Sequence, residues 1–415
     1  MELFENKKEI ERALLVAVDC GTYDTECSLD ELEELARTAG AEVIARMTQK
    51  RDTPNSTSYV GSGRLEEIRE FCEANEVNLI LVDDELTPSQ LKNIEQETDV
   101  RVVDRTTLIL DIFAARARTS EGKLQVEMAQ LKYALPRLTG KGTQLSRLGG
   151  GIGTRGPGET KLESDRRHIR RKLYNLQQEL LAMEKRRNAL RSRRKKDGVE
   201  TVAIVGYTNA GKSTLMNALT QAGVLEEDML FATLDPTARK LILPDGRSVM
   251  LVDTVGLVRR LPHNLVEAFK STLEEAAQAD VILNVCDGSS PECHEHLEVT
   301  GTLLHELNCD DKPILSVINK CDKIPDVLDL PVIGKSVMIS AKNGTGLEKL
   351  LDEIAKALPP TRRKATLLLP FDKGAVAAEI RKDGIILEEE YVEAGLKLTC
   401  IADIRFLETV RDYMV

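Results

Sequence analysis

Short apolar runs alternate with amphipathic segments along the first quarter of the chain, a pattern typical of α/β domains. The strand-like runs lie at residues 13–19, 41–47, 79–83 and 100–103. The segments with helical spacing of apolar positions lie at residues 28–39, 64–74 and 88–97. No catalytic motif falls among them. We therefore predict a small N-terminal α/β domain over residues 1–105.

The next region, residues 106–198, has helical spacing almost throughout. Apolar side chains recur at intervals of three and four residues at Ile169, Leu173, Leu176, Leu180, Met183 and Leu190. Arg187 interrupts this seam. The spacing predicts a long amphipathic helix at about 163–196, packed against an earlier helix at about 107–137. The Gly-rich segment 140–161 between them has no such period, so we expect a loop at the tip of a helical arm.

Residues 199–358 alternate buried-type strands with helices again and carry four short motifs. The first motif, Gly206-Tyr-Thr-Asn-Ala-Gly-Lys-Ser213, follows the apolar run 201–205 and precedes a helix at 214–220. This arrangement predicts a loop whose backbone N–H groups surround phosphates, with the positive end of the helix dipole behind it. Lys212 would reach the β- and γ-phosphates, and the Ser213 hydroxyl would ligate Mg²⁺. The expected phosphate contacts are Gly206, Tyr207, Thr208, Asn209, Ala210, Gly211, Lys212, Ser213 and Thr214.

The other three motifs complete a guanine-nucleotide pocket. Asp253-Thr254-Val255-Gly256 follows a strand; its carboxylate would hold Mg²⁺ and the Gly256 N–H would sense the γ-phosphate. In Asn319-Lys320-Cys321-Asp322, the Asp322 carboxylate can accept hydrogen bonds from the N1 proton and the 2-amino group of guanine. Adenine has neither of these donors. Ser340-Ala341-Lys342 closes the base pocket. The motifs predict GTP rather than ATP, on a doubly wound, mostly parallel sheet.

Residues 231–237 lie where a first switch loop is expected. Its predicted GTP contacts are Phe231, Ala232, Thr233, Leu234 and Asp235. Thr233 would complete the Mg²⁺ ligands Ser213 and Asp253, with Thr237 as the alternative. Phe231 is more consistent with a hydrophobic anchor than with base recognition. We assign the catalytic roles to Lys212, Thr233 and Gly256.

Two residues bear on hydrolysis. Many GTPases place a water-orienting glutamine after Asp-Thr-Val-Gly, where this chain has Leu257. An apolar side chain cannot orient water, so either basal hydrolysis is slow or another group completes the site. Asn209 either helps to hold K⁺ beside the phosphates or only shapes the loop.

The charge distribution points to a polyanionic partner. The chain carries a net charge of −11, yet residues 130–197 contain 19 Lys plus Arg against 6 Asp plus Glu, a net of +13. Tyr133 and Tyr174 are the aromatic residues of this block, so phosphate contacts on structured RNA are favoured over base stacking. The expected RNA contacts are Arg147, Arg155, Lys161, Arg193, Arg194, Lys195 and Lys196. The alternatives are a solvated helix face and, for the Gly-rich loop, a flexible linker.

Composition limits the location and the metal chemistry. The apolar run Ala13–Val18 is too short for a signal peptide or membrane span, and eight cysteines without a Cys-x-x-Cys pair suit a reducing cytosol. We expect a cytoplasmic monomer with no transmembrane segment and no DNA partner. Cys293-His294-Glu-His296 is more consistent with a solvated helix start after Pro291 than with zinc.

The last region, 359–415, follows a linker marked by Pro359-Pro360 and the basic residues 362–364. Its pattern predicts strand, helix, two strands and helix, a small α+β domain for which a ferredoxin-like form is one possibility.

Beyond the four motifs, the chain resembles the HflX family of GTPases, which belongs to a translation-factor-related class with Era, Obg and TrmE. The further matching segments lie at residues 59–68, 125–138, 149–163 and 261–275. Leu257 fits this family. The resemblance implies a factor that binds the large ribosomal subunit and ribosomal RNA, dissociates or rescues stalled or idle ribosomes, and hydrolyses GTP faster on the ribosome. An RNA-binding adaptor with GTP as a structural ligand is the alternative, and a nucleotide kinase is disfavoured.

Overall fold

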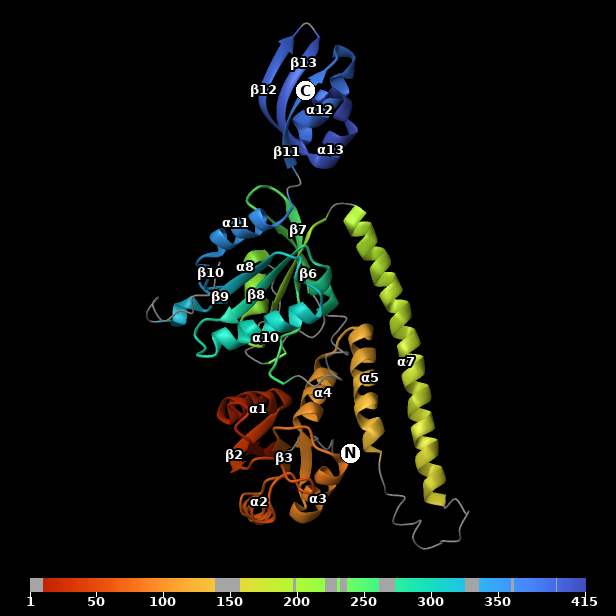
Figure 1. Ribbon diagram of the computed structural model, residues 1–415, viewed down its shortest axis with the longest axis vertical. Coiled ribbons are helices and arrows are strands. Elements are labelled where there is room, and N and C mark those ends of the chain that lie inside the picture. Colours follow the sequence, from red (N-terminus) through yellow and green to blue (C-terminus); the bar gives the residue numbers. More distant parts are fainter. Residues whose placement is uncertain are drawn as a thin grey trace, which may run out of the picture. The chain divides into compact units, whose positions relative to one another are not determined.

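The computed structural model describes residues 10–138, 157–196, 199–220, 230–231, 237–260, 273–324, 336–359, 362–392 and 394–415. By its internal contacts, the chain divides into two compact units, Met1–Leu351 and Asp352–Val415. Figure 1 shows the elements of both units in sequence colours.

The N-terminal part of the first unit is a four-stranded parallel sheet in the order β2-β1-β3-β4. The strands are β1 (Glu11–Asp19), β2 (Ala41–Lys50), β3 (Leu79–Val82) and β4 (Arg101–Asp104). The connecting helices are α1 (Thr25–Ala39), α2 (Ser62–Ala74) and α3 (Pro88–Thr98). Each predicted strand and helix of this part is confirmed to within a few residues, because the apolar runs form the buried centre of the sheet.

Local capping explains where these helices begin and end. The Asp24 side chain accepts a hydrogen bond from the Cys27 N–H at the start of α1, and Gly40 ends that helix with φ +91°. At α3, Thr87 and Gln90 form a reciprocal capping box ahead of Pro88.

The helical arm differs from the prediction at two points. The predicted helix at 107–137 is two helices, α4 (Arg105–Arg116) and α5 (Ser120–Arg137). The break occurs because the Thr119 side chain accepts a hydrogen bond from the Gly122 N–H and so starts a new helix. The long helix α7 (Pro157–Lys196) begins earlier than predicted, so the last residues of the expected loop 140–161 are helical.

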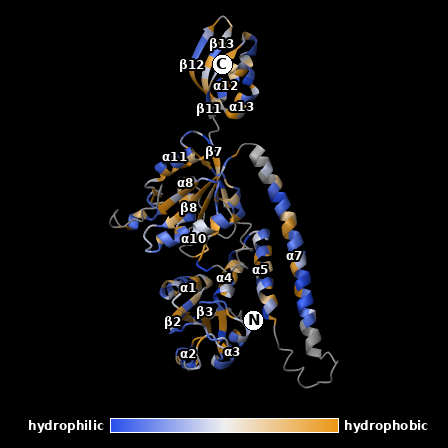
Figure 2. Ribbon diagram, viewed as in Figure 1, coloured by the Kyte–Doolittle hydropathy of each residue, from blue (hydrophilic) through white to orange (hydrophobic). Residues whose placement is uncertain are grey.

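The predicted pairing of α5 with α7 is confirmed by contacts along both helices (Figure 1). Ile169, Leu173, Leu176, Leu180 and Met183 are buried or half-buried, whereas Tyr174 and Leu181 between them are exposed. Figure 2 shows the coloured part of α7 as largely hydrophilic, interrupted by hydrophobic bands.

The break in this seam has a structural reason. Arg187 is half-buried on the seam, where its guanidinium pairs with Glu121 of α5 at 2.5 Å and with Glu274 at 3.2 Å. A buried charge of this kind needs partners, and two carboxylates provide them.

The C-terminal part of the first unit contains a six-stranded sheet in the order β10-β9-β8-β5-β7-β6. The strands are β5 (Thr201–Gly206), β6 (Thr237–Ile242), β7 (Ser248–Asp253), β8 (Val281–Asp287), β9 (Ile314–Asn319) and β10 (Ser336–Met338). The helices are α8 (Lys212–Thr220), α10 (Cys293–Glu306) and α11 (Leu347–Ala357), the last of which runs into the second unit. All strand pairs are parallel except β6 with β7. The doubly wound, mostly parallel sheet is therefore confirmed.

Strand β6 was not predicted. It lies at the edge of the sheet, and Ala238, Arg239 and Lys240 are exposed, so its apolar residues Leu241 and Ile242 are too few to mark a strand. Thr237, expected in the switch loop, is the first residue of this strand.

The second unit has an antiparallel sheet in the order β11-β13-β12, which confirms the small α+β domain. Its elements are β11 (Arg362–Leu369), α12 (Gly374–Asp383), β12 (Ile385–Val392), β13 (Gly395–Asp403) and α13 (Ile404–Thr409). The order of elements matches the prediction, but the described sheet has three strands and not the four of a ferredoxin-like fold. None of the helices in the described residues is long and apolar enough to cross a membrane.

The pairing of α5 and α7 can be tested with two leucines of the same helix. Leu176 is 6% exposed and Leu181 is 42% exposed. Leu176→Ala should lower the free energy of local opening by about 2 kcal/mol, through lost burial and a cavity. Amide hydrogen exchange within α5 should then accelerate by roughly 30-fold.

Leu181→Ala, the matched control, should leave exchange in α5 within error of the wild type. Equal acceleration of exchange in both variants would contradict the packing of Leu176 against α5.

Candidate nucleotide-binding site

The loop between β5 and α8 requires glycine at its two ends. Gly206 has φ +155°, and a Cβ there would lie 2.1 Å from the Val285 carbonyl oxygen. Gly211 has φ +85°, and its Cβ would lie 2.3 Å from the Asn319 Nδ2. Any side chain would force these strands and loops apart, so the backbone can adopt the predicted phosphate-binding turn only with glycine.

Lys212 lies at the centre of this loop. Its side chain is buried and its Nζ donates a 2.6 Å hydrogen bond to the Tyr207 carbonyl oxygen. Burial lowers the pKa of Lys212 to about 8, against the opposing influence of the Asp253 carboxylate. A desolvated ammonium that folds back over its own loop is suited to bind an anion such as a phosphate.

Two oxygen donors meet beside this lysine. The Ser213 Oγ donates a 3.0 Å hydrogen bond to Oδ2 of Asp253, which is fully buried. They meet because β5 and β7 are neighbouring parallel strands, so both chains leave the sheet at the same edge. A hydroxyl and a carboxylate are ligands that Mg²⁺ prefers, so this pair fits the predicted metal position.

The third predicted metal ligand, Thr233, lies outside the described residues, as do Ala232, Leu234 and Asp235. The alternative ligand, Thr237, directs its hydroxyl to the Met216 sulfur at 3.4 Å.

The segment after β7 closes against the phosphate loop. A Cβ on Gly256 would lie 2.7 Å from the Thr208 Cγ2 and 3.0 Å from the Lys212 Nζ, so only glycine permits this approach. Thr254 is held by a 2.7 Å hydrogen bond from its hydroxyl to the Ile204 carbonyl oxygen. The arrangement brings the Gly256 backbone next to the lysine that is predicted to reach the γ-phosphate.

The predicted base pocket is also assembled. The Asn319 amide donates to the Ala210 carbonyl oxygen at 2.9 Å and accepts from the Ala341 N–H at 3.0 Å. The Ser340 hydroxyl donates to Oδ1 of Asp322 at 2.6 Å, and this hydrogen bond is the largest cause of the lowered pKa of Asp322. An ionised carboxylate held in this orientation can accept from guanine.

The lysine of the same motif connects the two halves of the pocket. Lys320 has φ +61°, and its Nζ pairs with Asp287 at 2.7 Å and donates to Asn209 Oδ1 at 3.3 Å. Asn209 itself has φ +58°. These contacts give the loop-shaping interpretation of Asn209 a structural basis, and its K⁺ role stays a prediction.

Two residues on the predicted GTP contact list have contacts with distant segments. The Phe231 ring packs edge-on against Phe113 of α4 with centroids 4.5 Å apart, consistent with a hydrophobic anchor. The Tyr207 ring stacks on His296 of α10 at 3.9 Å, and its hydroxyl donates a 2.9 Å hydrogen bond to Glu31 of α1.

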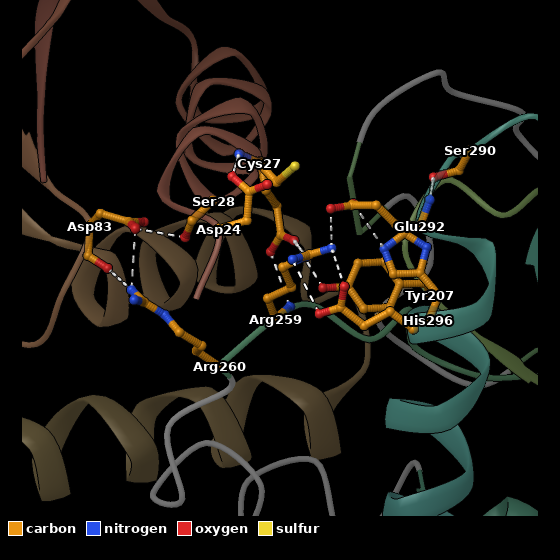
Figure 3. A network of polar contacts seen from close by, with 12 residues as sticks. Asp24, Cys27, Ser28, Asp83, Tyr207, Arg259, Arg260, Ser290, Glu292 and His296 are labelled. Atoms are coloured by element: carbon orange, nitrogen blue, oxygen red, sulfur yellow. Dashed lines mark hydrogen bonds and ion pairs between the residues drawn. The ribbon is translucent and has the colours of Figure 1, made fainter. Parts of the chain in front are cut away.

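Glu31 is the centre of a polar network that the sequence did not indicate. Figure 3 shows other members of this network, Tyr207, Arg259 and Glu292, close together. The Glu31 carboxylate pairs with Arg105 at 2.5 Å and accepts a 3.1 Å hydrogen bond from the Arg259 backbone N–H. The Arg259 guanidinium pairs in turn with Glu292 at 2.5 Å and Glu295 at 3.3 Å. Burial raises the pKa of Glu31, although the nearby Arg105, Tyr207 and Arg259 oppose this shift.

A second branch of this network runs through Asp83 at the end of β3. Asp83 is fully buried and pairs with Arg105 at 2.7 Å and with Arg260 at 3.3 Å, while Ser28 donates to it at 2.6 Å. Arg260 also lies over the Tyr23 ring, 4.1 Å from its centroid. The two arginines that follow the Asp253–Gly256 motif are thus both paired with the N-terminal domain (Figure 3).

The interpretation of the Cys-His segment needs correction. A helix does begin at Cys293, but Cys293 and His296 are not solvated: Cys293 is buried with its sulfur 2.7 Å from that of Cys286, and His296 lies on Tyr207. Within the part of the chain that the structure describes, no three His, Cys, Asp or Glu side chains are grouped for a metal ion.

The predicted RNA-contacting residues are described only in part. Arg147 and Arg155 lie outside the described residues. Lys161, Arg193, Arg194, Lys195 and Lys196 lie on α7 at positions whose side chains are not described. Elsewhere on α7, basic side chains are exposed, among them Arg167, Arg170, Arg171, Lys185 and Arg186.

Comparison with known proteins identifies the family. Family models match residues 26–114 (GTP-binding GTPase N-terminal), 116–194 (GTP-binding GTPase Middle Region) and 201–320 (50S ribosome-binding GTPase). The GTPase HflX of Caldanaerobacter subterraneus subsp. tengcongensis is 51% identical over 413 residues, covering 99% of this chain and 95% of that protein. The chain belongs to the GTPase HflX family.

Two further comparisons place this HflX-family GTPase among its relatives. GTPase HflX of Lacrimispora saccharolytica is 48% identical over 398 residues, covering 95% of this chain and 94% of that protein. A crystal structure of a GTP-binding protein from the hyperthermophilic archaeon Sulfolobus solfataricus in complex with GDP is 27% identical, with a TM-score of 0.45, and covers 84% of this chain and 98% of that one. Membership of the GTPase HflX family, shown by the relatives and by the GTPase family model over residues 201–320, confirms the predicted GTPase activity at the level of the family.

The close approach at Gly211 can be tested against a matched glycine. Gly211→Ala should weaken GDP binding more than tenfold, because its Cβ would collide with the Asn319 amide. Gly246 has a similar φ of +81° but nothing within 4 Å of its Cβ position. Gly246→Ala should therefore cost about 1 kcal/mol of stability without changing the dissociation constant for GDP.

Fluorescent-GDP titration of both variants measures this difference. If both weaken binding equally, backbone strain and not the collision is responsible.

The base pocket can be tested at Asp322. Asp322→Asn should weaken GDP binding by on the order of 100-fold and shift the preference toward xanthosine diphosphate, whose N1 and 2-oxo groups complement an amide. Competition between the two nucleotides measures the shift. Asp245→Asn, the same change at an exposed position outside the pocket, should leave the preference unaltered. Retained guanine selectivity in Asp322→Asn would refute the assignment.

Proposed function

We propose that this GTPase binds the large ribosomal subunit and ribosomal RNA, and that it uses GTP to dissociate or rescue stalled or idle ribosomes. Hydrolysis would be stimulated by the ribosome. The description of the family model over residues 201–320 as a 50S ribosome-binding GTPase supports the choice of partner. A ribosomal partner implies a cytoplasmic location, and we expect a monomer.

The observation that carries the proposal is the connection between the γ-phosphate sensor and the N-terminal domain. Arg259 and Arg260 follow Gly256 by three and four residues, and they pair with Glu31 and Asp83 of the N-terminal domain. A movement of the Asp253–Gly256 segment on loss of the γ-phosphate would pull on these contacts. The nucleotide state would thereby reach the domain and helical arm that are expected to touch RNA.

Electrostatics supports RNA as the partner of the arm. The exposed arginines and lysines of α7 lie on a helix whose opposite side packs on α5. Lys172 and Arg187 have acidic partners, Glu127 and Glu121, on α5. With 19 basic and 6 acidic residues between 130 and 197, acids within this block are too few to neutralise the remaining bases. A surface of this kind is suited to phosphates.

In the pocket, Lys212 and the Gly256 N–H would contact the γ-phosphate, and Thr233 would order the first switch. Ser213, Thr233 and Asp253 would hold Mg²⁺, which neutralises charge on the phosphate oxygens when bound. Asn209 would help to hold K⁺ if a monovalent cation takes part, in which case exchange of K⁺ for Na⁺ would slow hydrolysis.

Sedimentation tests the ribosome proposal. Intact ribosomes are mixed with the protein and either a non-hydrolysable GTP analogue or GDP, then separated on a sucrose gradient. We expect comigration with the large subunit and loss of the intact-ribosome peak with the analogue alone. Lys212→Ala, which should lose tight nucleotide binding, provides the control that separates nucleotide dependence from simple RNA affinity.

Single-turnover hydrolysis with and without large subunits tests the activation. The intrinsic rate should be on the order of 10⁻⁴ to 10⁻² per second, as in switch GTPases without full activation, and the subunit should raise it. Equal rates would refute stimulation by the ribosome. Absence of comigration in every nucleotide state would refute the ribosomal partner.

An RNA-binding adaptor that uses GTP as a structural ligand is the second candidate. Leu257 favours it, because this side chain is 6% exposed and cannot orient water. Asp253→Asn discriminates the two: RNA-dependent function that survives this change supports the adaptor, and its loss supports the switch.

A further inference from the structure

Three cysteines gather at the guanine end of the pocket. Cys286 is the second-last residue of strand β8, Cys293 is the first residue of α10, and Cys321 belongs to the Asn319–Asp322 motif. Cys286 and Cys293 are 1% and 2% exposed and pack with Leu297 and Ile318, and Cys321 packs against this cluster.

Two of these thiols are in direct contact. The Cys286 and Cys293 sulfurs are 2.7 Å apart, whereas the described contact of the Cys321 sulfur is with the Ile318 carbonyl oxygen at 3.3 Å. A disulfide bond is about 2.05 Å long. A small shift of the segment 287–292 would therefore suffice to join Cys286 to Cys293, without any rearrangement of the sheet.

We propose that Cys286 and Cys293 form a reversible disulfide when the protein meets a hydroperoxide. This modification site is independent of the ribosomal function proposed above. It would place a redox-sensitive bond next to Asp287, which pairs with Lys320.

The two thiols differ in reactivity. The hydrogen bond between the two thiols lowers the pKa of Cys293, and the same contact, together with burial, raises the pKa of Cys286. Cys293 also lies at the N-terminus of α10, where the helix dipole favours a thiolate. Cys293 is thus the attacking sulfur and Cys286 the resolving one.

The chemistry balances as a two-electron oxidation. The Cys293 thiolate attacks the terminal peroxide oxygen, forming an S–O bond and breaking the O–O bond, so that an alcohol (or water) leaves and a sulfenic acid remains. The Cys286 sulfur then attacks the Cys293 sulfur and displaces the hydroxyl group, which leaves as water with the Cys286 proton. Two thiols and one hydroperoxide become one disulfide, one alcohol and one water.

The bond would act on the nucleotide through the segment that it closes. Asp287, directly after Cys286, pairs with Lys320 at 2.7 Å, and Lys320 reaches Asn209 of the phosphate loop. Glu292, directly before Cys293, pairs with Arg259 at 2.5 Å. A cross-link that restrains both ends of this segment preorganises the pocket wall. Release of bound GDP should therefore become at least about threefold slower.

Peptide mapping of the full chain tests the bond itself. The protein is treated with hydrogen peroxide, its remaining thiols are alkylated, and it is digested with a protease that cleaves after glutamate. Glu292 lies between the two cysteines, so their peptides separate unless the disulfide joins them. We expect a linked pair that dithiothreitol separates. Recovery of both cysteines in alkylated form, or a link from either one to Cys321, would overturn the proposal.

Dissociation of fluorescent GDP tests the consequence. Peroxide should slow release from the wild type and from Cys72→Ser, which changes a buried cysteine of the N-terminal domain, but not from Cys286→Ser or Cys293→Ser. Each variant must first bind GDP normally when reduced. If a variant does not bind GDP normally when reduced, the peptide mapping of the wild type alone decides whether the disulfide forms. A mapped disulfide with unchanged release would keep the modification site and refute its effect on the nucleotide.

Discussion

The GTP pocket depends on one buried side chain, the amide of Asn319. It donates to the Ala210 carbonyl oxygen of the phosphate loop and accepts from the Ala341 N–H of the base loop. It therefore fixes the distance between the part that would hold the phosphates and the part that would hold the base. Each backbone group that it satisfies would cost about 1–3 kcal/mol if left buried without a partner. The requirement for glycine at position 211 follows, because a Cβ there would occupy the space of this amide.

A different constraint joins the nucleotide domain to the N-terminal domain. Glu31 serves three donors at once, the Arg105 guanidinium, the Tyr207 hydroxyl and the Arg259 backbone N–H. Buried charges are stable only while their partners remain, and removal of one partner costs several kcal/mol. The network therefore favours two states, fully paired or opened, over gradual adjustment. This property would suit the proposed response of the contact to the loss of one phosphate.

Much of the GTP site could be predicted because each motif follows a strand at the same edge of the sheet and each function requires particular residue types. Gly211 and Asp322 are examples, although their ligand contacts remain predictions. The Glu31 network could not be predicted in this way. Its members come from separate domains, far apart in the sequence, and form no recognisable motif, so only the fold brings them together. The edge strand β6 was not predicted because only its last two residues, Leu241 and Ile242, form an apolar run. The end of α4 had a local signal, Thr119 ahead of a new helix, that helical periodicity obscured.

The position of Leu257 bears on how this GTPase would hydrolyse its nucleotide. Its N–H donates to the Gly206 carbonyl oxygen at 3.1 Å, and its carbonyl oxygen accepts from the Thr208 N–H at 2.8 Å. These two bonds extend the pairing of the sheet into the phosphate loop and leave the side chain in the apolar core. In any orientation this aliphatic side chain supplies no group that can orient water. If the ribosome stimulates hydrolysis, as proposed above, the group that orients the attacking water would come from another residue or from the partner, and Lys212 and the neighbouring backbone would position the phosphates.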